Sequence, residues 1–90
     1  MTKFIISVDD GHPSDMRVAS VLSRYNVRGT FFVPKSNCEG RIVIGKQEIV
    51  DLIEMGHEVG AHGLTHRYLT KLSDSQAFQE IDGSKKYLED

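Results

Sequence analysis

Apolar residues along the chain follow two spacings, which alternate from one segment to the next. Lys3–Val8 and Gly29–Val33 are short apolar runs rich in β-branched and aromatic side chains, which is typical of buried strands. His57–His62 is a weaker run of the same kind, and Arg41–Ile44 is a candidate for a short extra strand in the loop before it. Because a segment with helical spacing follows each of the three main runs, the pattern predicts strand, helix, strand, helix, strand, helix.

The three expected helices are marked by signals at their ends. The first begins at Pro13, a residue suited to the first helical position, and ends at Asn26, which tolerates the left-handed conformation. The second ends at Gly56, and the third begins with the capping box Ser73–Gln76. The expected apolar faces are Val18, Val21, Leu22 and Tyr25 in the first helix, Ile49, Leu52 and Ile53 in the second, and Ala77, Ile81, Ser84 and Leu88 in the third.

Three successive βα units predict an α/β chain with parallel strands, because a helix between two strands returns the chain to the end of the sheet at which it began. At 90 residues the chain forms one domain at most. Hydrophobic residues make up 39% and charged residues 27%, which is typical of a globular domain and argues against disorder.

Charge and apolar patterning exclude several kinds of partner. The net charge is -2, and the basic residues are scattered apart from Lys85 and Lys86, so nucleic acid is not an expected partner. No apolar run approaches the roughly 18 residues of a membrane span. The start is too short for a signal peptide, and the single cysteine, Cys38, fits a reducing compartment, so we expect a cytoplasmic location by default.

Two acidic residues follow the first expected strand. Asp9 and Asp10 repel each other unless a cation or a proton lies between them, and Gly11 permits a sharp turn after them. The alternative is that Asp-Asp-Gly only forms a turn or caps the next helix.

Two histidines, His62 and His66, follow the third expected strand. Imidazoles four residues apart can bind one metal ion, although such a pair also arises by chance or in structural hydrogen bonding. If the first and third strands share a parallel sheet, the acidic pair and the histidines open onto the same end of it. A carboxylate with two imidazoles forms a metal site, and a second carboxylate beside it is placed to accept a proton from water, which indicates metal-assisted hydrolysis. His57, in contrast, is expected to be structural.

The order and spacing of these motifs resemble the polysaccharide deacetylase family (NodB-type, carbohydrate esterase family 4). The resemblance rests on Ser7–Gly11, Gly29–Val33, Gly56–His62 and the pair His62 and His66. Ser7-Val8 replaces the Thr-Phe of the family's first motif, and Gly63 stands where the family has Ser or Thr, which removes a possible hydrogen bond beside the metal.

The resemblance implies a fold, a set of ligands and a reaction. The fold is a distorted (β/α) barrel, of which residues 1–90 are the N-terminal portion with three βα units. By the resemblance, Asp10, His62 and His66 bind a divalent metal, expected to be Zn²⁺, and Asp9 is the general base. The reaction hydrolyses a carbon–nitrogen bond and removes an N-acetyl (or O-acetyl) group from a carbohydrate. The family's later Arg-x-Pro and Leu-x-His motifs have no match here, so we expect the chain to lack the general acid and to be incomplete as a catalyst.

Two alternatives from other classes remain at this point. One is a non-catalytic metal-binding fragment that self-assembles into a homo-oligomer or associates with the remainder of the barrel, because three βα units alone leave a sheet edge and apolar faces exposed. The other is a receiver-like phospho-acceptor module, which also has an acidic pair after its first strand. That module needs an aspartate at the end of the next strand, where this chain has Phe31–Pro34.

Overall fold

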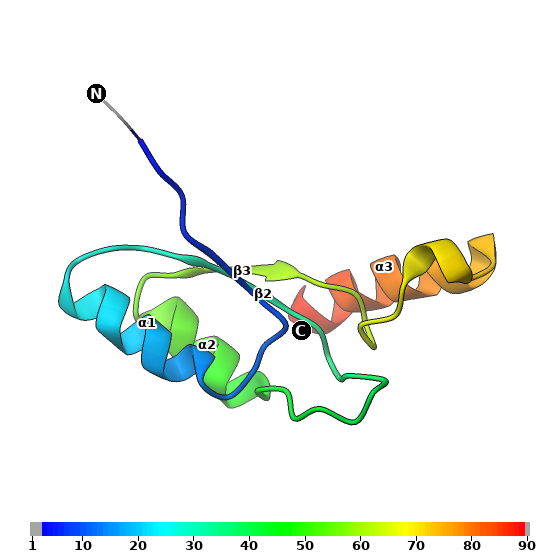
Figure 1. The fold of residues 1–90 in the computed structure, drawn as a ribbon, viewed down its shortest axis with the longest axis horizontal. Helices are drawn as coiled ribbons and strands as arrows, with labels where there is room; N and C mark the ends of the chain where they lie inside the picture. The colour runs from blue at the N-terminus through cyan, green and yellow to red at the C-terminus, as the bar shows by residue number, and fades with distance from the viewer. Residues whose placement is uncertain (1–2, 90) are drawn as a thin grey trace.

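The computed structural model describes residues 3–89, and its centre is a three-stranded parallel sheet in the order β1-β2-β3. α1 joins β1 to β2, and α2 joins β2 to β3 (Figure 1). The predicted α/β class with three parallel βα units is confirmed. The elements are β1 (Ser7–Asp9), α1 (Asp15–Arg24), β2 (Thr30–Val33), α2 (Lys46–Glu54), β3 (Glu58–Ala61), the 3-10 turn η1 (Leu69–Lys71) and α3 (Asp74–Glu89).

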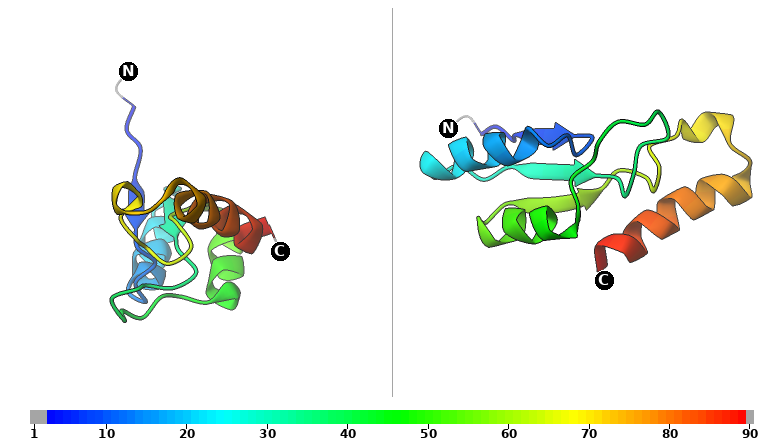
Figure 2. Two further views of the ribbon diagram at one scale, coloured as in Figure 1. Left: turned by 90° about the vertical axis from the view of Figure 1, so that its right-hand side faces the viewer. Right: turned by 90° about the horizontal axis from the view of Figure 1, so that it is seen from below.

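The helices α1 and α2 cover one face of the sheet, as the views in Figures 1 and 2 show. The core lies in this layer. Side chains alternate between the two faces of a strand, so Val8, which packs on the core, points toward the helices, and Asp9 points to the other face. The buried apolar side chains of the core are Ala19, Phe31, Val33, Ile44, Ile49 and Leu52.

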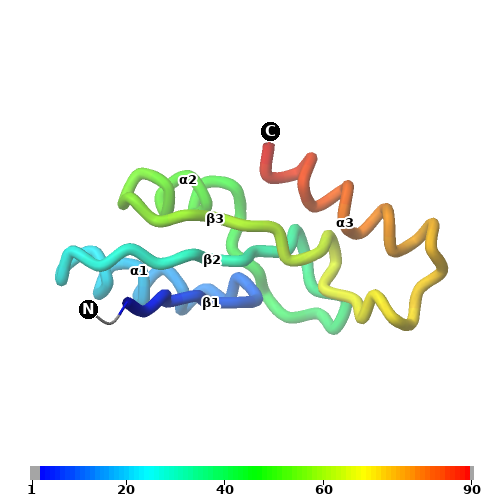
Figure 3. Tube along the Cα trace, turned by 90° about the horizontal axis from the view of Figure 1, so that it is seen from above, coloured from blue at the N-terminus to red at the C-terminus, as the bar shows by residue number. Residues whose placement is uncertain are grey.

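α3 lies apart from this layer, beyond the carboxyl ends of the strands, and runs back toward α2 (Figure 3). Its last turn brings Tyr87 and Leu88 against the core. The segment between β3 and α3 therefore crosses the end of the sheet at which polar residues follow β1 and β3.

His57 joins α1 to the beginning of β2 and β3. Its side chain is buried, and its Nδ1 accepts a hydrogen bond from the Gly29 N–H at 3.0 Å. Nε2 therefore carries the proton, which it can donate to the Ala19 carbonyl oxygen at 3.0 Å; the Ser23 hydroxyl lies at the same distance. The expected structural role of His57 is confirmed.

Several expected boundaries are wrong, for identifiable reasons. The first strand does not cover Lys3–Val8, because its pairing with β2 begins only where the Thr30 N–H meets the Ile6 carbonyl oxygen at 3.0 Å. Arg41–Ile44 forms no strand; one hydrogen bond, from the Ile44 N–H to the Gly11 carbonyl oxygen at 2.8 Å, anchors it.

The first helix begins two residues after Pro13, because the His12 imidazole accepts the Ser14 N–H at 3.0 Å and holds this segment in a turn. The buried faces also differ from the expected ones. α1 buries Asp15 and Ala19, whereas Val18 and Val21 are partly exposed, and α3 buries Glu80 and Ser84.

The end signals are confirmed at three places. Asn26 and Gly56 adopt the left-handed conformation after α1 and α2, with φ of 57° and 93°. In the capping box, the Ser73 N–H donates to Gln76 Oε1 at 3.1 Å and the Gln76 N–H donates to Ser73 Oγ at 3.2 Å. Local chemistry thus determined the helix ends, whereas contacts with the sheet determined which helix faces are buried.

Candidate metal centre

Three side chains converge at the carboxyl ends of β1 and β3. Asp10 directly follows β1, and His62 directly follows β3. The Oδ1 atom of Asp10 lies 2.7 Å from His62 Nε2 and 2.9 Å from His66 Nε2. The two imidazole rings are 4.9 Å apart between centroids. Asp10, His62 and His66, which are far apart in the sequence, are therefore neighbours at this end of the sheet.

The backbone reaches this arrangement through left-handed conformations. Asp10 and His66 have φ of 80° and 61°, which is uncommon for residues with a side chain, and Gly11 and Gly63 have φ of 66° and 77°. At Gly11 the close packing also requires glycine, because a Cβ there would lie 3.0 Å from a methyl group of Val33. Gly63 thus lies at a position where the backbone favours glycine over a residue with a side chain.

Asp10 is electrostatically matched to the histidines. Partial burial raises the pKa of its carboxyl group, but the hydrogen bonds to His62 and His66 and the interaction with their charges outweigh this effect and hold the pKa below its ordinary value. The negatively charged form, which is the form that binds a cation, is therefore favoured.

The three residues fit a divalent metal in both chemistry and position. Their ligand atoms all lie within 4.8 Å of one another. Two imidazole nitrogens and one carboxylate oxygen are the protein donors of a common type of catalytic zinc site. Ligand atoms around tetrahedral zinc are about 3.3 Å apart, so the observed separations of 2.7 and 2.9 Å would need to widen by only about 0.5 Å. The side chains are between 28% and 49% exposed, which leaves the centre accessible.

Asp9, the expected general base, does not join this cluster. It is exposed on the face of the sheet that α1 and α2 leave open, in register with Phe32. Within residues 3–89, no hydrogen bond or ion pair involves its carboxylate. Its role as a base stays a prediction.

Three residues near the centre were not identified from the sequence. Glu80 of α3 binds Thr65 in the turn between the two histidines, and Asn37 Nδ2 lies 3.5 Å from His66 Nδ1. Asp15 is only 4% exposed, and its Oδ2 has no hydrogen-bond partner among residues 3–89. Burial raises the pKa of Asp15; His12 opposes this, and Asp10 and Asp9 add to it. The unusual polarity of a buried helix position was the available signal for Glu80 and Asp15.

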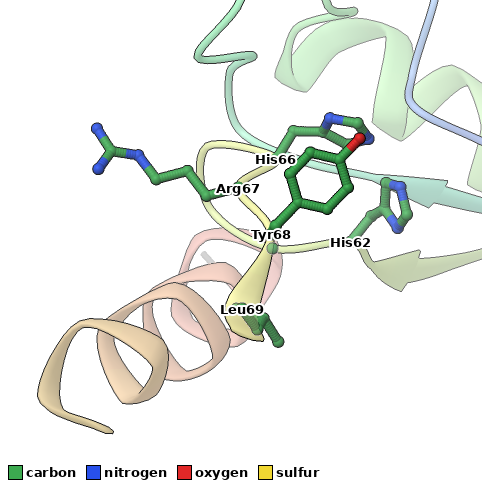
Figure 4. A pocket seen from close by; sticks show the side chains of 6 residues that line it. His62, His66, Arg67, Tyr68 and Leu69 are labelled. Atoms are coloured by element: carbon green, nitrogen blue, oxygen red, sulfur yellow. The ribbon is translucent and has the colours of Figure 1, made fainter. Parts of the chain in front are cut away.

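A hollow of about 370 Å³ adjoins the histidines. Figure 4 shows Tyr68 beside the two imidazoles and the Arg67 guanidinium directed away from them. The Tyr68 side chain is 72% exposed, and Lys71 Nζ lies 5.3 Å from the centroid of its ring. The hollow therefore offers an aromatic surface next to His62 and His66. It is lined by His62, Gly63, His66, Arg67, Tyr68 and Leu69.

Comparison with known proteins identifies relatives of this chain. The sequence model of the polysaccharide deacetylase family matches residues 2–90. The peptidoglycan-N-acetylglucosamine deacetylase PgdA of Listeria monocytogenes is 34% identical over 86 residues, which is 93% of this chain and 18% of that protein.

Solved structures agree with this relationship. The structure of the peptidoglycan deacetylase PdaC from Bacillus subtilis has a TM-score of 0.77 at 26% identity and is matched over 94% of this chain and 41% of that one. The chitin deacetylase from the fungal pathogen Colletotrichum lindemuthianum also has a TM-score of 0.77 at 26% identity, over 93% of this chain and 38% of that one. The chain thus spans a fifth to two fifths of the length of these relatives, and its three βα units correspond to part of their barrel. It belongs to the polysaccharide deacetylase family (NodB-type, carbohydrate esterase family 4).

Proposed function

We propose that the protein is a metal-dependent hydrolase that removes N-acetyl or O-acetyl groups from carbohydrate, and that residues 1–90 are the N-terminal portion of its catalytic domain. The observation that carries the proposal is the convergence of Asp10 Oδ1 with the Nε2 atoms of His62 and His66. Relatives described as peptidoglycan and chitin deacetylases support the substrate class.

In this mechanism Asp10, His62 and His66 would hold the metal, which we propose is Zn²⁺ because the donor set is one that zinc prefers. A divalent cation supplies Lewis acidity, which makes water more acidic and polarises a carbonyl group. Asp10 contributes the negative charge of the centre, and the two neutral imidazoles contribute directed lone pairs. The left-handed backbone at Asp10 and His66 fixes the directions from which these donors approach.

Asp9 is the candidate base. Its exposed carboxylate follows Val8 at the last position of β1, one residue from the metal ligand Asp10. There it would accept the proton of the water that attacks the acetyl carbonyl carbon. As the carbon–nitrogen (or carbon–oxygen) bond breaks, that proton passes to the departing amine (or alcohol), and acetate is released with an oxygen from water in its carboxylate.

The hollow beside the histidines is the candidate site for the sugar. The flat face of an aromatic ring suits the C–H groups of a pyranose, and the Tyr68 ring is the exposed aromatic surface that borders His62 and His66. A sugar on this surface would have its acetyl group near the metal ligands. Peptidoglycan and chitin fragments are both compatible with such a surface.

The decisive experiment measures zinc and acetate separately. Wild-type protein, Asp10→Asn and the surface control His12→Gln are titrated with Zn²⁺ by calorimetry and then assayed for acetate release from N-acetylglucosamine oligomers. Zinc binding and acetate release that Asp10→Asn loses and His12→Gln retains are the expected result. Zinc binding without acetate release would favour a non-catalytic metal-binding role, and no zinc binding would overturn the proposal.

The open face of the sheet supports a second proposal about partners. Phe4 and Ile5, in the segment that leads into β1, are 76% and 88% exposed, and parallel sheets are ordinarily covered on both faces. We infer that another polypeptide segment covers this face, either a second copy of this chain or the remainder of the barrel. For the 90-residue chain alone, light scattering is expected to show a dimer or larger species; a folded monomer at micromolar concentration would contradict self-association.

A further inference from the structure

Glu80 is a buried carboxylate that bonds to Thr65, its one hydrogen-bond partner within residues 3–89. Its side chain belongs to α3 and is only 7% exposed. Oε1 accepts hydrogen bonds from the Thr65 N–H and the Thr65 hydroxyl, both at 2.9 Å, and Oε2 lies 3.0 Å from the same hydroxyl. Among residues 3–89 no basic side chain forms an ion pair with it. A buried carboxylate is costly unless hydrogen bonds compensate for the lost water, so the bonds from Thr65 are needed to keep Glu80 in place.

The partner of Glu80 lies between the two histidines of the metal centre. Thr65 directly precedes His66, whose φ is 61°. A residue with a side chain keeps such a conformation only where its surroundings hold it there. The bonds made by Thr65 are therefore placed to determine where the His66 imidazole points.

The turn is held from two sides. On one side, the N–H groups of Lys35 and Ser36 donate to the Leu64 carbonyl oxygen, both at 3.0 Å, and the Cys38 N–H donates to the Thr65 carbonyl oxygen at 2.9 Å. These bonds satisfy the carbonyl groups of the turn. On the other side, Glu80 satisfies the Thr65 N–H and hydroxyl.

A second contact places α3 against the same turn. Gly83 lies one helical turn after Glu80, and a Cβ on it would be 3.1 Å from Leu64 Cδ2. Glycine inside a helix costs about 1 kcal/mol relative to alanine. Here it allows the Leu64 side chain to approach the helix closely, so apolar packing and a buried carboxylate act on neighbouring residues of the turn.

We propose that Glu80 is a positioning residue for the metal centre, acting through Thr65 to hold His62 and His66 at the separation that binds one cation. This inference rests on the proposed function, which supplies the metal. The contact between Glu80 and Thr65 is independent of it. Neither Glu80 nor Thr65 belongs to the group of side chains that would hold the metal. The carboxylate uses both oxygens on Thr65, whereas an amide at this position retains only one acceptor.

The test compares variants of the protein as its gene encodes it, using Co²⁺ as the probe. Glu80→Gln is expected to weaken Co²⁺ binding by about tenfold, as for other residues that orient metal ligands. Thr65→Val, which keeps the N–H but loses the hydroxyl, is expected to weaken binding too, and Thr65→Ser to restore it. Glu89→Gln is the matched control, because Glu89 is exposed on the same helix. The double variant with Glu80→Gln and Thr65→Val should lose less Co²⁺ binding free energy than the sum of the two single losses, because both changes act on one contact.

Two further readouts separate positioning from general stability. The visible absorption spectrum of bound Co²⁺ reports coordination geometry, and it should change in Glu80→Gln but not in Glu89→Gln. Hydrogen exchange of the Thr65 amide, measured without metal, should accelerate in Glu80→Gln. Folded Glu80→Gln with wild-type affinity and spectrum would overturn the inference. If wild-type protein binds no Co²⁺, the proposed function and the metal role of Glu80 both fail, while the exchange rate still shows whether the Glu80–Thr65 contact exists.

Discussion

His57 provides the most quantitative test of how this fold is held together. We predict that His57→Ala destabilises the protein severely, although the residue lies outside the metal centre. The imidazole is 4% exposed and connects the Gly29 N–H to the Ala19 carbonyl oxygen. It also packs edge-on against Phe31, with 5.2 Å between ring centroids.

The magnitude follows from the groups that lose their partner. Gly29 is buried, so truncation leaves its N–H without a hydrogen bond, whereas the Ala19 carbonyl lies inside α1 and keeps its place in the helix. The unpaired N–H costs about 1–3 kcal/mol, and the lost packing on Phe31 adds to this cost. We therefore expect a loss of about 2–4 kcal/mol, which is a large fraction of the stability of a small domain.

Urea unfolding followed by circular dichroism measures the effect. His57→Gln offers one acceptor and one donor in place of the imidazole and should recover about half of the loss. His12→Ala, which removes an exposed imidazole from the turn before α1, should cost at most about 1 kcal/mol. The reasoning is refuted if His57→Ala is no less stable than His12→Ala, or if glutamine is no better than alanine at position 57.

Three further predictions concern the surroundings of the metal centre. Burial raises the pKa of Asp15, so the charged carboxylate destabilises the fold above that pKa and the protonated form does not. Asp15→Asn should therefore be more stable than wild type at neutral pH in denaturant titrations. This gain should disappear as the pH falls below the ordinary pKa of aspartate. Gly63→Ala should cost about 1–2 kcal/mol, as should Gly40→Ala, because both glycines have left-handed φ (77° and 83°), but calorimetry should find weaker Zn²⁺ binding only for Gly63→Ala. Tyr68→Ala should raise KM for N-acetylglucosamine oligomers about three- to tenfold with little change in kcat, as expected for the loss of an aromatic contact, and an unchanged KM would exclude the proposed sugar surface.

The fold was predictable from the sequence where local signals decide it. The order of strands and helices, the capping box at Ser73 and the helix end at Gly56 all follow from residues close together in the chain. The buried helix faces were not predictable in the same way, because they depend on where the sheet lies. Val18 and Val21 have the right spacing for a core face, yet α1 turns Asp15 and Ala19 inward.

The same division between local and distant causes explains the metal centre. The acidic pair follows β1 and the histidines follow β3, and these positions together with the family resemblance predicted Asp10, His62 and His66 as one cluster, which the structure brings together. The sequence could not show what keeps the turn at His66 in place. The groups responsible are a backbone segment about 28 residues earlier in the chain and the Glu80 carboxylate on α3. A ligand motif thus specifies which atoms can bind a metal, whereas their separation depends on distant contacts. For this reason a second protein with the same Asp-Asp-Gly and His-x-x-x-His motifs but no acceptor at the position of Glu80 should bind the metal more weakly, although its motifs are intact.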